Sequence, residues 1–412
     1  MEEKEVRILK KSNLYIEKFN KGVRNMKINP YMIAFILLSI VIFIFSIIII
    51  NLFFSINKIK ESISHDENEN TKKIHFHKTN TKFEMPKKLF HYKDDDLDNI
   101  DKNKRKIHIS YSLDDQLIYP TLVSMLSGLE NNNNSNNILI YHLLLSHNFT
   151  TSNIEIFESL KENYEVKINY YIIPPIFSNM KSWTKGTDCV YYKILLPLMF
   201  PELKRIIYLD GDTLIRKDIL EMYEYPFNDN YILGQPFYMP YVMDKYGINA
   251  THYINGGCLL FNIEKIRKDK KDFDLLHFTI EKNDMLRFRE QDSINYVFYP
   301  KIGFLPLKYG MYMIGDNHSF NDISRLIRSP VNLTEGYEAI KEPSIVHFSC
   351  CWPKVWEYKS ENLFDVHSIC RRYRKEFYYY AKKSKYYSDI YNTLYKKTRP
   401  EKENKAKKEK NI

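Results

Sequence analysis

The chain has 412 residues, a formal net charge of +10, and a content of 44% hydrophobic and 15% aromatic residues. This composition excludes general disorder, and the length fits one α/β catalytic domain of about 250 residues with flanking segments. The lysines are spread along the chain and concentrated in its two tails, a distribution that argues against nucleic acid as a partner.

The first predicted element is an uncharged apolar run of twenty residues, from Tyr31 to Ile50. At about 1.5 Å per residue, such a run crosses a hydrocarbon core of about 30 Å. Five basic residues stand in the twenty positions before the run and two in the twenty positions after it, so we expect the N-terminus to be cytosolic. The sequence therefore predicts a cytosolic tail (1–30), a retained transmembrane anchor (31–54) and a single-pass type II protein whose remaining residues are luminal.

The expected luminal part contains Asn-x-Ser/Thr sites that agree with this topology, although an asparagine-rich chain also contains such sites by chance. They are Asn133, Asn148, Asn249, Asn317 and Asn332. The five cysteines lack the CxxC pairs of zinc sites. Since adjacent cysteines bridge each other only with strain, Cys350 and Cys351 leave two alternatives open, a bond to Cys370 or free thiols.

Beyond the anchor, residues 55–105 are charged and polar and predict a stem, and the pattern changes at Lys106. Apolar strands and helical spacings then alternate, which predicts one α/β catalytic domain (106–360) with a mainly parallel sheet covered on both faces. The expected strands are 107–111, 138–145, 166–173, 205–210 and 344–348, and the expected helices are 122–129 and 154–160. Residues 361–395 predict a C-terminal helical region, and residues 396–412 predict a disordered basic tail.

Two carboxylates follow the apolar strand that ends at position 209, in the sequence Asp210-Gly211-Asp212. They stand at the carboxyl end of a sheet strand, where α/β folds bind ligands. Two hard oxygen donors suit Mg²⁺ or Mn²⁺, which bridges a diphosphate and stabilises the charge on a departing phosphate. An Asp-Gly turn with a solvated second aspartate is the commoner reason for this pattern alone, but the buried strand before it favours a functional site.

Three later positions combine polar side chains with apolar strands or a helix start. Asn255 and two glycines precede an apolar stretch, which predicts either a backbone that passes close to a ligand or an ordinary glycine turn. Residues 290–292 stand at an expected helix start, where they either contact a sugar or cap the helix. His347 lies on the last strand and is either a satisfied core residue or a metal ligand.

Taken in order, these segments resemble glycosyltransferase family 8 over about residues 106–360. The resemblance rests on the strand and acidic turn at 107–119, the helix Tyr191-Tyr192-Lys193-Ile194-Leu195-Leu196-Pro197, Leu209-Asp210-Gly211-Asp212, Asn255-Gly256-Gly257-Cys258-Leu259-Leu260-Phe261-Asn262, Gln291-Asp292-Ser293-Ile294-Asn295 and His347-Phe348. It implies a single Rossmann-like nucleotide-diphospho-sugar transferase domain of the GT-A type. The sheet of such a domain is mixed and mainly parallel, and here one N-terminal transmembrane helix would precede it.

The resemblance also implies a role for individual residues. Mn²⁺ would be held by Asp210, Asp212 and His347, and the metal would hold the diphosphate of a UDP-sugar. The donor nucleotide and phosphates would be contacted by Asp114, Gln116, Lys193 and Lys354. The sugar and the reaction centre would be contacted by Asn255, Glu290 and Gln291, with Gln291 stabilising the oxocarbenium-like centre from the face opposite the acceptor.

The expected activity is retaining, Mn²⁺-dependent transfer of a hexose, glucose or galactose, from a UDP-sugar to a glycan or glycoprotein acceptor, in the Golgi or a related membrane of the secretory pathway. The segment after His347 departs from the family pattern, with Cys350 at the position of the family's glycine. This departure motivates an alternative, a catalytically inactive membrane-anchored protein that binds sugars. A nucleotidyltransferase or phosphohydrolase could use the same carboxylates, but it would leave Asn255, Gln291 and His347 without a role.

Overall fold

The computed structural model describes residues 103–132, 134, 136–181, 188–237, 252–312, 333–349, 354–356 and 368–396. The expected cytosolic tail, the anchor at 31–54, most of the stem and the basic tail beyond 396 lie outside these residues. Within the described part of the chain, no helix combines the length and the apolar character needed to cross a membrane.

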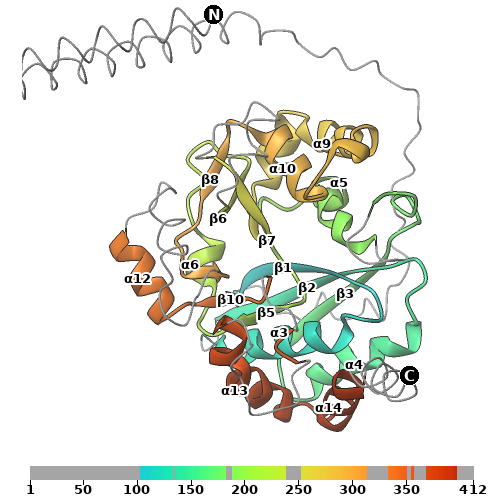
Figure 1. Cartoon of the computed structure of the whole chain (residues 1–412), viewed down its shortest axis with the longest axis vertical. Coiled ribbons are helices and arrows are strands. Elements are labelled where there is room, and N and C mark those ends of the chain that lie inside the picture. The colour runs from blue at the N-terminus through green and yellow to red at the C-terminus, as the bar shows by residue number, and fades with distance from the viewer. Residues whose placement is uncertain are drawn as a thin grey trace, which may run out of the picture. The chain divides into compact units, whose positions relative to one another are not determined.

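Two β-sheets organise the described residues (Figure 1). The strands are β1 (Arg105–Leu113), β2 (Asn137–Leu145), β3 (Val166–Ile172), β4 (Ile206–Leu209), β5 (Thr213–Ile215), β6 (Ile232–Pro236), β7 (Ile254–Phe261), β8 (Ile302–Phe304), β9 (Tyr309–Met311) and β10 (Ile345–His347). The larger sheet has the order β3-β2-β1-β4-β7-β6-β8, and the smaller sheet has the order β5-β10-β9. In the larger sheet only β7 runs antiparallel to its neighbours, so the prediction of a mixed, mainly parallel sheet is confirmed.

Helices cover both faces of the larger sheet (Figure 1). One face carries α3 (Ile118–Asn131), α4 (Ile154–Glu158), α13 (Ser368–Lys383) and α14 (Tyr387–Lys396), and the other carries α5 (Leu196–Met199), α8 (Ile263–Lys268), α9 (Lys271–Glu281) and α10 (Glu290–Phe298). The helices α6 (Leu220–Tyr223) and α12 (Leu333–Lys341) lie beside the smaller sheet. Because each face packs against helices, β2 and β4 are buried at every position.

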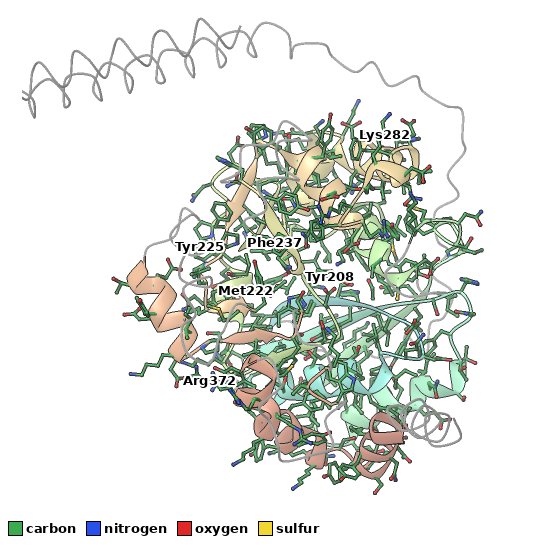
Figure 2. The ribbon with its side chains drawn as sticks, in the orientation of Figure 1. Tyr208, Met222, Tyr225, Phe237, Lys282 and Arg372 are labelled. Atoms are coloured by element: carbon green, nitrogen blue, oxygen red, sulfur yellow. The ribbon has the colours of Figure 1, made fainter. Side chains whose placement is uncertain are left out.

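Two apolar cores follow from this arrangement, one on each face. The first joins β1 and β2 to α3 and α13, and the second joins β4 and β7 to α5, α9 and α10. Figure 2 shows the side chains between these layers, with Tyr208 and Met222 in the interior and Arg372 at the surface. The cores hold the carboxyl ends of β1 and β4 side by side, which positions the loops that follow these strands.

Most sequence-based predictions of individual elements are confirmed, with two differences. The five expected strands and the helices at 122–129 and 154–160 are present, the latter as α4 flanked by 3₁₀ turns. The segment 191–197 is mainly a 3₁₀ helix, η4 (Cys189–Leu195), followed by α5. Of the two alternatives for Asn255–Gly257, the glycine turn is wrong, because β7 already begins at Ile254.

The glycines of β7 are explained by close packing and not by a turn. A Cβ on Gly257 would lie 2.0 Å from Cε1 of His347 and 2.6 Å from Oδ2 of Asp210. Only a residue without a side chain lets β7 pass so near to the side chains of His347 and Asp210. Asn295 of α10 holds the start of the strand, because its amide accepts a hydrogen bond from Ile254 N and donates one to Ile254 O.

The cysteines divide into two kinds. Cys189 and Cys258 are buried free thiols, and burial raises the pKa of both. Cys370, which is buried in the first turn of α13, is disulfide-bonded. Its partner lies outside the described residues, as do Cys350 and Cys351.

Candidate active site

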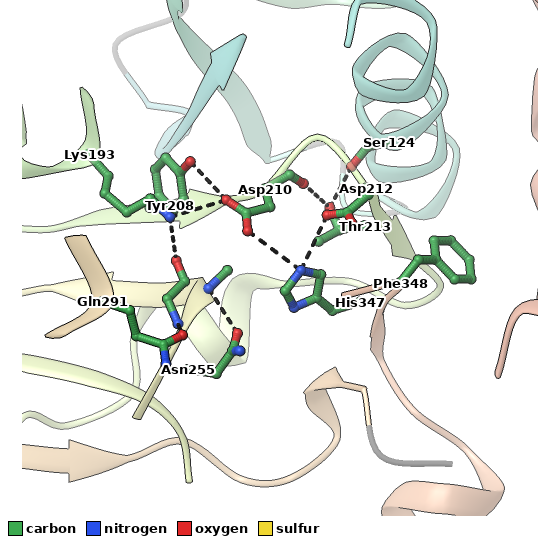
Figure 3. A network of polar contacts seen from close by, with 12 residues as sticks. Ser124, Lys193, Tyr208, Asp210, Asp212, Thr213, Asn255, Gln291, His347 and Phe348 are labelled. Carbon is green, nitrogen blue, oxygen red and sulfur yellow. Dashed lines mark hydrogen bonds and ion pairs between the residues drawn. The ribbon is translucent and has the colours of Figure 1, made fainter. Parts of the chain in front are cut away.

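Three side chains of the kinds that bind metal ions converge where the two sheets meet. Asp210 follows β4, Asp212 precedes β5 and His347 ends β10. Nε2 of His347 lies 3.5 Å from Oδ2 of Asp210 and 3.2 Å from Oδ1 of Asp212 (Figure 3). The antiparallel pairing of β10 with β5 places His347 opposite Thr213, so the smaller sheet delivers the imidazole to the carboxylates.

The turn that carries the carboxylates is fixed by hydrogen bonds on both sides. The backbone N–H of Asp210 donates to the carbonyl of Gly257 in β7 over 2.8 Å. On the other side, the Thr213 hydroxyl donates to the carbonyl of Asp210 over 2.9 Å and contacts the Ser124 hydroxyl of α3 at 2.8 Å (Figure 3). A Cβ on Gly211 would lie 2.4 Å from the Thr121 hydroxyl, so the turn also packs directly on α3.

The three side chains fit a divalent metal ion. Their ligand atoms lie within 4.8 Å of one another, and among the described residues they are the one such group of three or more. Two carboxylates and an imidazole are a donor set that divalent metals accept. The missing side chain at Gly257 keeps the place beside His347 and Asp210 open.

The electrostatics of the group keep both carboxylates ionised. Burial alone would raise the pKa of Asp212, but the Lys354 ammonium and His347 outweigh it and hold the pKa below its usual value. Lys193 and His347 have the same effect on the pKa of Asp210. Burial lowers the pKa of His347, but the two carboxylates outweigh burial and raise it to about 9. Without a metal, the imidazole is therefore a cation at neutral pH.

Lys354 contacts the same group of side chains through Asp212. Its Nζ is 2.6 Å from Oδ2 of Asp212 and donates to the carbonyl of Phe348 over 2.9 Å. The structure thus brings Lys354 to Asp212. Its contact with the donor phosphate stays a prediction.

Lys193 joins Asp210 to the neighbouring helix α10. Its side chain is 1% exposed, and its Nζ donates to Oδ1 of Asp210 (3.2 Å), the carbonyl of Gly256 (2.9 Å) and Oε1 of Glu290 (3.0 Å). The Tyr208 hydroxyl donates to the same Oδ1 of Asp210 over 2.9 Å (Figure 3). Burial raises the pKa of Glu290, with Lys193 opposing the shift.

Gln291 and Asn255 lie next to this network and contact the glycines of β7. Oε1 of Gln291 accepts a hydrogen bond from Gly256 N (2.8 Å), and Oδ1 of Asn255 accepts one from Gly257 N (2.9 Å). Neither Gln291 nor Glu290 caps α10, which has no side-chain cap. The capping alternative is therefore not what the structure shows for Glu290 and Gln291, whereas Asp292 accepts hydrogen bonds from the backbone amides of Arg287 and Phe288 just before the helix.

Asp114 and Gln116 follow β1, which is the parallel neighbour of β4, so their loop lies at the same edge of the sheet as Asp210. Oδ1 of Asp114 accepts a hydrogen bond from Gln116 N over 2.9 Å. Next to them, Asp115 fastens the loop by accepting hydrogen bonds from both the amide and the hydroxyl of Thr150. The role of Asp114 and Gln116 with a nucleotide stays a prediction.

Sequence reasoning gave no role to Tyr208, whose hydroxyl contacts Asp210, and gave no structural partner to Asp292 or Asn295 of the 291–295 motif. Asp292 accepts hydrogen bonds from the Tyr253 hydroxyl and from the amides of Arg287 and Phe288, and Asn295 holds the start of β7. The signal that could have found them is a polar side chain at a fully buried position of a strand or helix.

Comparison with known proteins identifies the architecture. Residues 108–360 match the model of glycosyl transferase family 8. A Haemophilus influenzae protein that bears the name of a glycosyltransferase is 21% identical over 266 residues, which are 62% of this chain and 75% of that protein.

Two solved structures have a similar fold. The bifunctional glycosyltransferase WbbM is 16% identical, with a TM-score of 0.57 over 71% of this chain and 52% of that chain, so this chain spans about half of WbbM. The galactosyltransferase LgtC, solved with donor and acceptor sugar analogues, is 16% identical, with a TM-score of 0.55 over 68% of this chain and 96% of LgtC. At this level of identity, the likeness shows a shared α/β fold.

Proposed function

This chain belongs to glycosyltransferase family 8, and on that premise we propose that it transfers a hexose, glucose or galactose, from a UDP-sugar to a glycan or glycoprotein acceptor. The observation that carries the proposal is the convergence of Asp210, Asp212 and His347 beside the Lys193 and Glu290 pair. LgtC, which has the same fold, was solved with analogues of a donor and an acceptor sugar. A GT-A-like site for a nucleotide sugar and an acceptor accounts for both facts.

The proposed cofactor is Mn²⁺, held by the two aspartates and His347. When bound, the metal would neutralise charge on the donor diphosphate and act as a Lewis acid. The residues around it have separate tasks. Asp114 and Gln116 are proposed to contact uracil and ribose, and Lys354 to contact a phosphate once it leaves Asp212.

The proposed reaction retains the anomeric configuration. The bond between the anomeric carbon and the phosphate oxygen breaks, the acceptor oxygen attacks from the same face, and the acceptor proton passes to the leaving phosphate. Gln291 lies beside Gly256 with its amide oxygen held by a backbone N–H, and from there it would stabilise positive charge at the anomeric carbon. Asn255 and Glu290 would hold sugar hydroxyls, for which buried carboxylate and amide groups are suited.

Hydrolysis of the donor tests this function, since water often replaces a missing acceptor. The full-length chain would be offered a panel of UDP-sugars with and without Mn²⁺, with His347→Ala as the control. Release of UDP from one sugar that needs both Mn²⁺ and His347 is the expected result. Tight UDP binding without release from any sugar, and without transfer to an acceptor mixture, would favour the inactive sugar-binding alternative.

We also propose that the chain is a type II protein of the Golgi or a related membrane, anchored through residues 31–54, with the catalytic domain luminal. The apolar run and the basic residues before it support this topology. The disulfide at Cys370 supports it as well, because disulfides persist in oxidising compartments. In sealed membrane vesicles the domain should resist added protease until detergent opens them, and cleavage without detergent would contradict the topology.

A further inference from the structure

Lys193 is a fully buried cation with three partners in different elements of the site. It donates to Asp210, which belongs to the metal-ligating group, and to Glu290, the first residue of α10. Its third partner is the carbonyl of Gly256 in β7. The ammonium also lies 4.5 Å above the ring of Tyr208.

These contacts use the whole hydrogen-bonding capacity of the side chain. A lysine ammonium has three N–H donors and no acceptor, and here each donor has a protein acceptor. With a side chain 1% exposed, Lys193 has no donor left for a substrate. A direct contact with the donor, which the family resemblance implies, would require at least one of these hydrogen bonds to break.

The contact with Asp210 has a geometric consequence. Lys193 and Tyr208 both donate to Oδ1 of Asp210, whereas Oδ2 of the same carboxylate faces His347. The two hydrogen bonds therefore fix the rotation of the carboxylate, with one oxygen held by the protein and the other presented to the metal position. Partners of this kind orient metal ligands and govern metal affinity.

We infer that Lys193 is a positioning residue: it orients Asp210 for the divalent metal and, through Glu290, ties the metal-ligating carboxylate to the helix that carries Gln291. This inference rests on the proposed function, because it assumes that the Asp210 group binds a metal.

The direction in which metal affinity changes when Lys193 is removed distinguishes this role from two alternatives. If Lys193 were only a neighbouring positive charge, its removal would relieve repulsion and strengthen metal binding. If it only contacted the donor, its removal would leave metal binding unchanged. Orientation of Asp210 predicts the opposite result, weaker metal binding.

The experiment measures Mn²⁺ affinity of the full-length chain at saturating UDP, from the electron paramagnetic resonance signal of free Mn²⁺. Lys193→Met should weaken Mn²⁺ binding by about tenfold or more, and Lys193→Arg, which keeps the charge and the donors, should recover most of the loss. The matched control is Lys265→Met, because Lys265 also pairs with two carboxylates, Asp229 and Asp269, but lies on α8. This control should bind Mn²⁺ like the wild type.

Unchanged or tighter Mn²⁺ binding by Lys193→Met would overturn the inference and leave the proposed function standing. A wild-type chain that binds no Mn²⁺ in the presence of UDP would overturn the metal site and the inference together. If circular dichroism shows that Lys193→Met is unfolded, Lys193→Gln decides by the same criterion, because glutamine keeps hydrogen-bond donors without the charge.

Discussion

Gly257→Ala adds a single methyl group, but we expect it to weaken Mn²⁺ binding strongly. A Cβ there would lie 2.0 Å from Cε1 and 2.6 Å from Nε2 of His347, and 2.6 Å from Oδ2 of Asp210. To regain ordinary van der Waals contact, His347 would have to retreat by about 1.4 Å, or β7 would have to move by a similar amount. Metal sites tolerate ligand displacements of only about 0.2 Å. We therefore expect a loss of Mn²⁺ affinity of about a hundredfold or more, and a cost of about 1–3 kcal/mol in folding free energy from overpacking.

The neighbouring glycine provides the control. A Cβ on Gly256 would lie 3.4 Å from its nearest neighbours, atoms of Gln291 and Glu290, which is ordinary contact. Gly256→Ala should therefore keep Mn²⁺ affinity within about threefold and lose less than about 1 kcal/mol of stability. Mn²⁺ titration at saturating UDP and urea denaturation would be run on both variants. Equal Mn²⁺ affinities for the two alanine variants would refute the argument, because it depends on the close approach at Gly257 alone.

Three other predictions concern the metal ligands and Gln291. Asp212→Asn should abolish Mn²⁺-dependent UDP binding, by calorimetry, while the far-UV spectrum stays native; unchanged UDP affinity would remove Asp212 from the metal site. Gln291→Ala should keep UDP affinity but reduce release of the sugar, and an equal loss of both would assign Gln291 to the nucleotide. The pKa of His347 is about 9 in the folded chain against an ordinary value of 6.5, so its stabilising contribution is complete below about pH 6.5 and is lost as pH rises through 9. In EDTA, the free energy of unfolding should fall over that range for the wild type and not for His347→Gln, and an equal fall in both would place the titrating group elsewhere.

The predictable part of this molecule is the part that local sequence pattern controls. The apolar runs of β1, β2 and β4 have the length and composition of buried parallel strands, and the aspartates after β4 stand where such strands end. No local pattern connects His347 to Asp210, and periodicity alone would have assigned His347 to the core. The order of the motifs in the family resemblance is what predicted His347 as a third metal ligand.

What the sequence could not provide is the packing between distant segments. Asn255 and the two glycines have the composition of a turn, and only the approach of His347, about 90 positions later in the chain, explains why they lie in a strand instead. The partners of Lys193 are equally hidden, because Asp210, Gly256 and Glu290 come together through the antiparallel pairing of β7 with β4 and the packing of α10. Such contacts depend on tertiary structure, on which residue spacing carries no information.

The charges of the site imply that metal and diphosphate depend on each other. Lys193 is already paired with Asp210 and Glu290, and Lys354 with Asp212, so two ammonium groups face three carboxylates and leave one uncompensated negative charge. A divalent cation that binds the carboxylates therefore leaves net positive charge on a largely buried group, which is unfavourable without a further anion. The diphosphate of the donor supplies that anion and offers Lys354 a partner in place of Asp212. Mn²⁺ should consequently bind more tightly with UDP than without it, and by linkage UDP should gain the same factor from Mn²⁺.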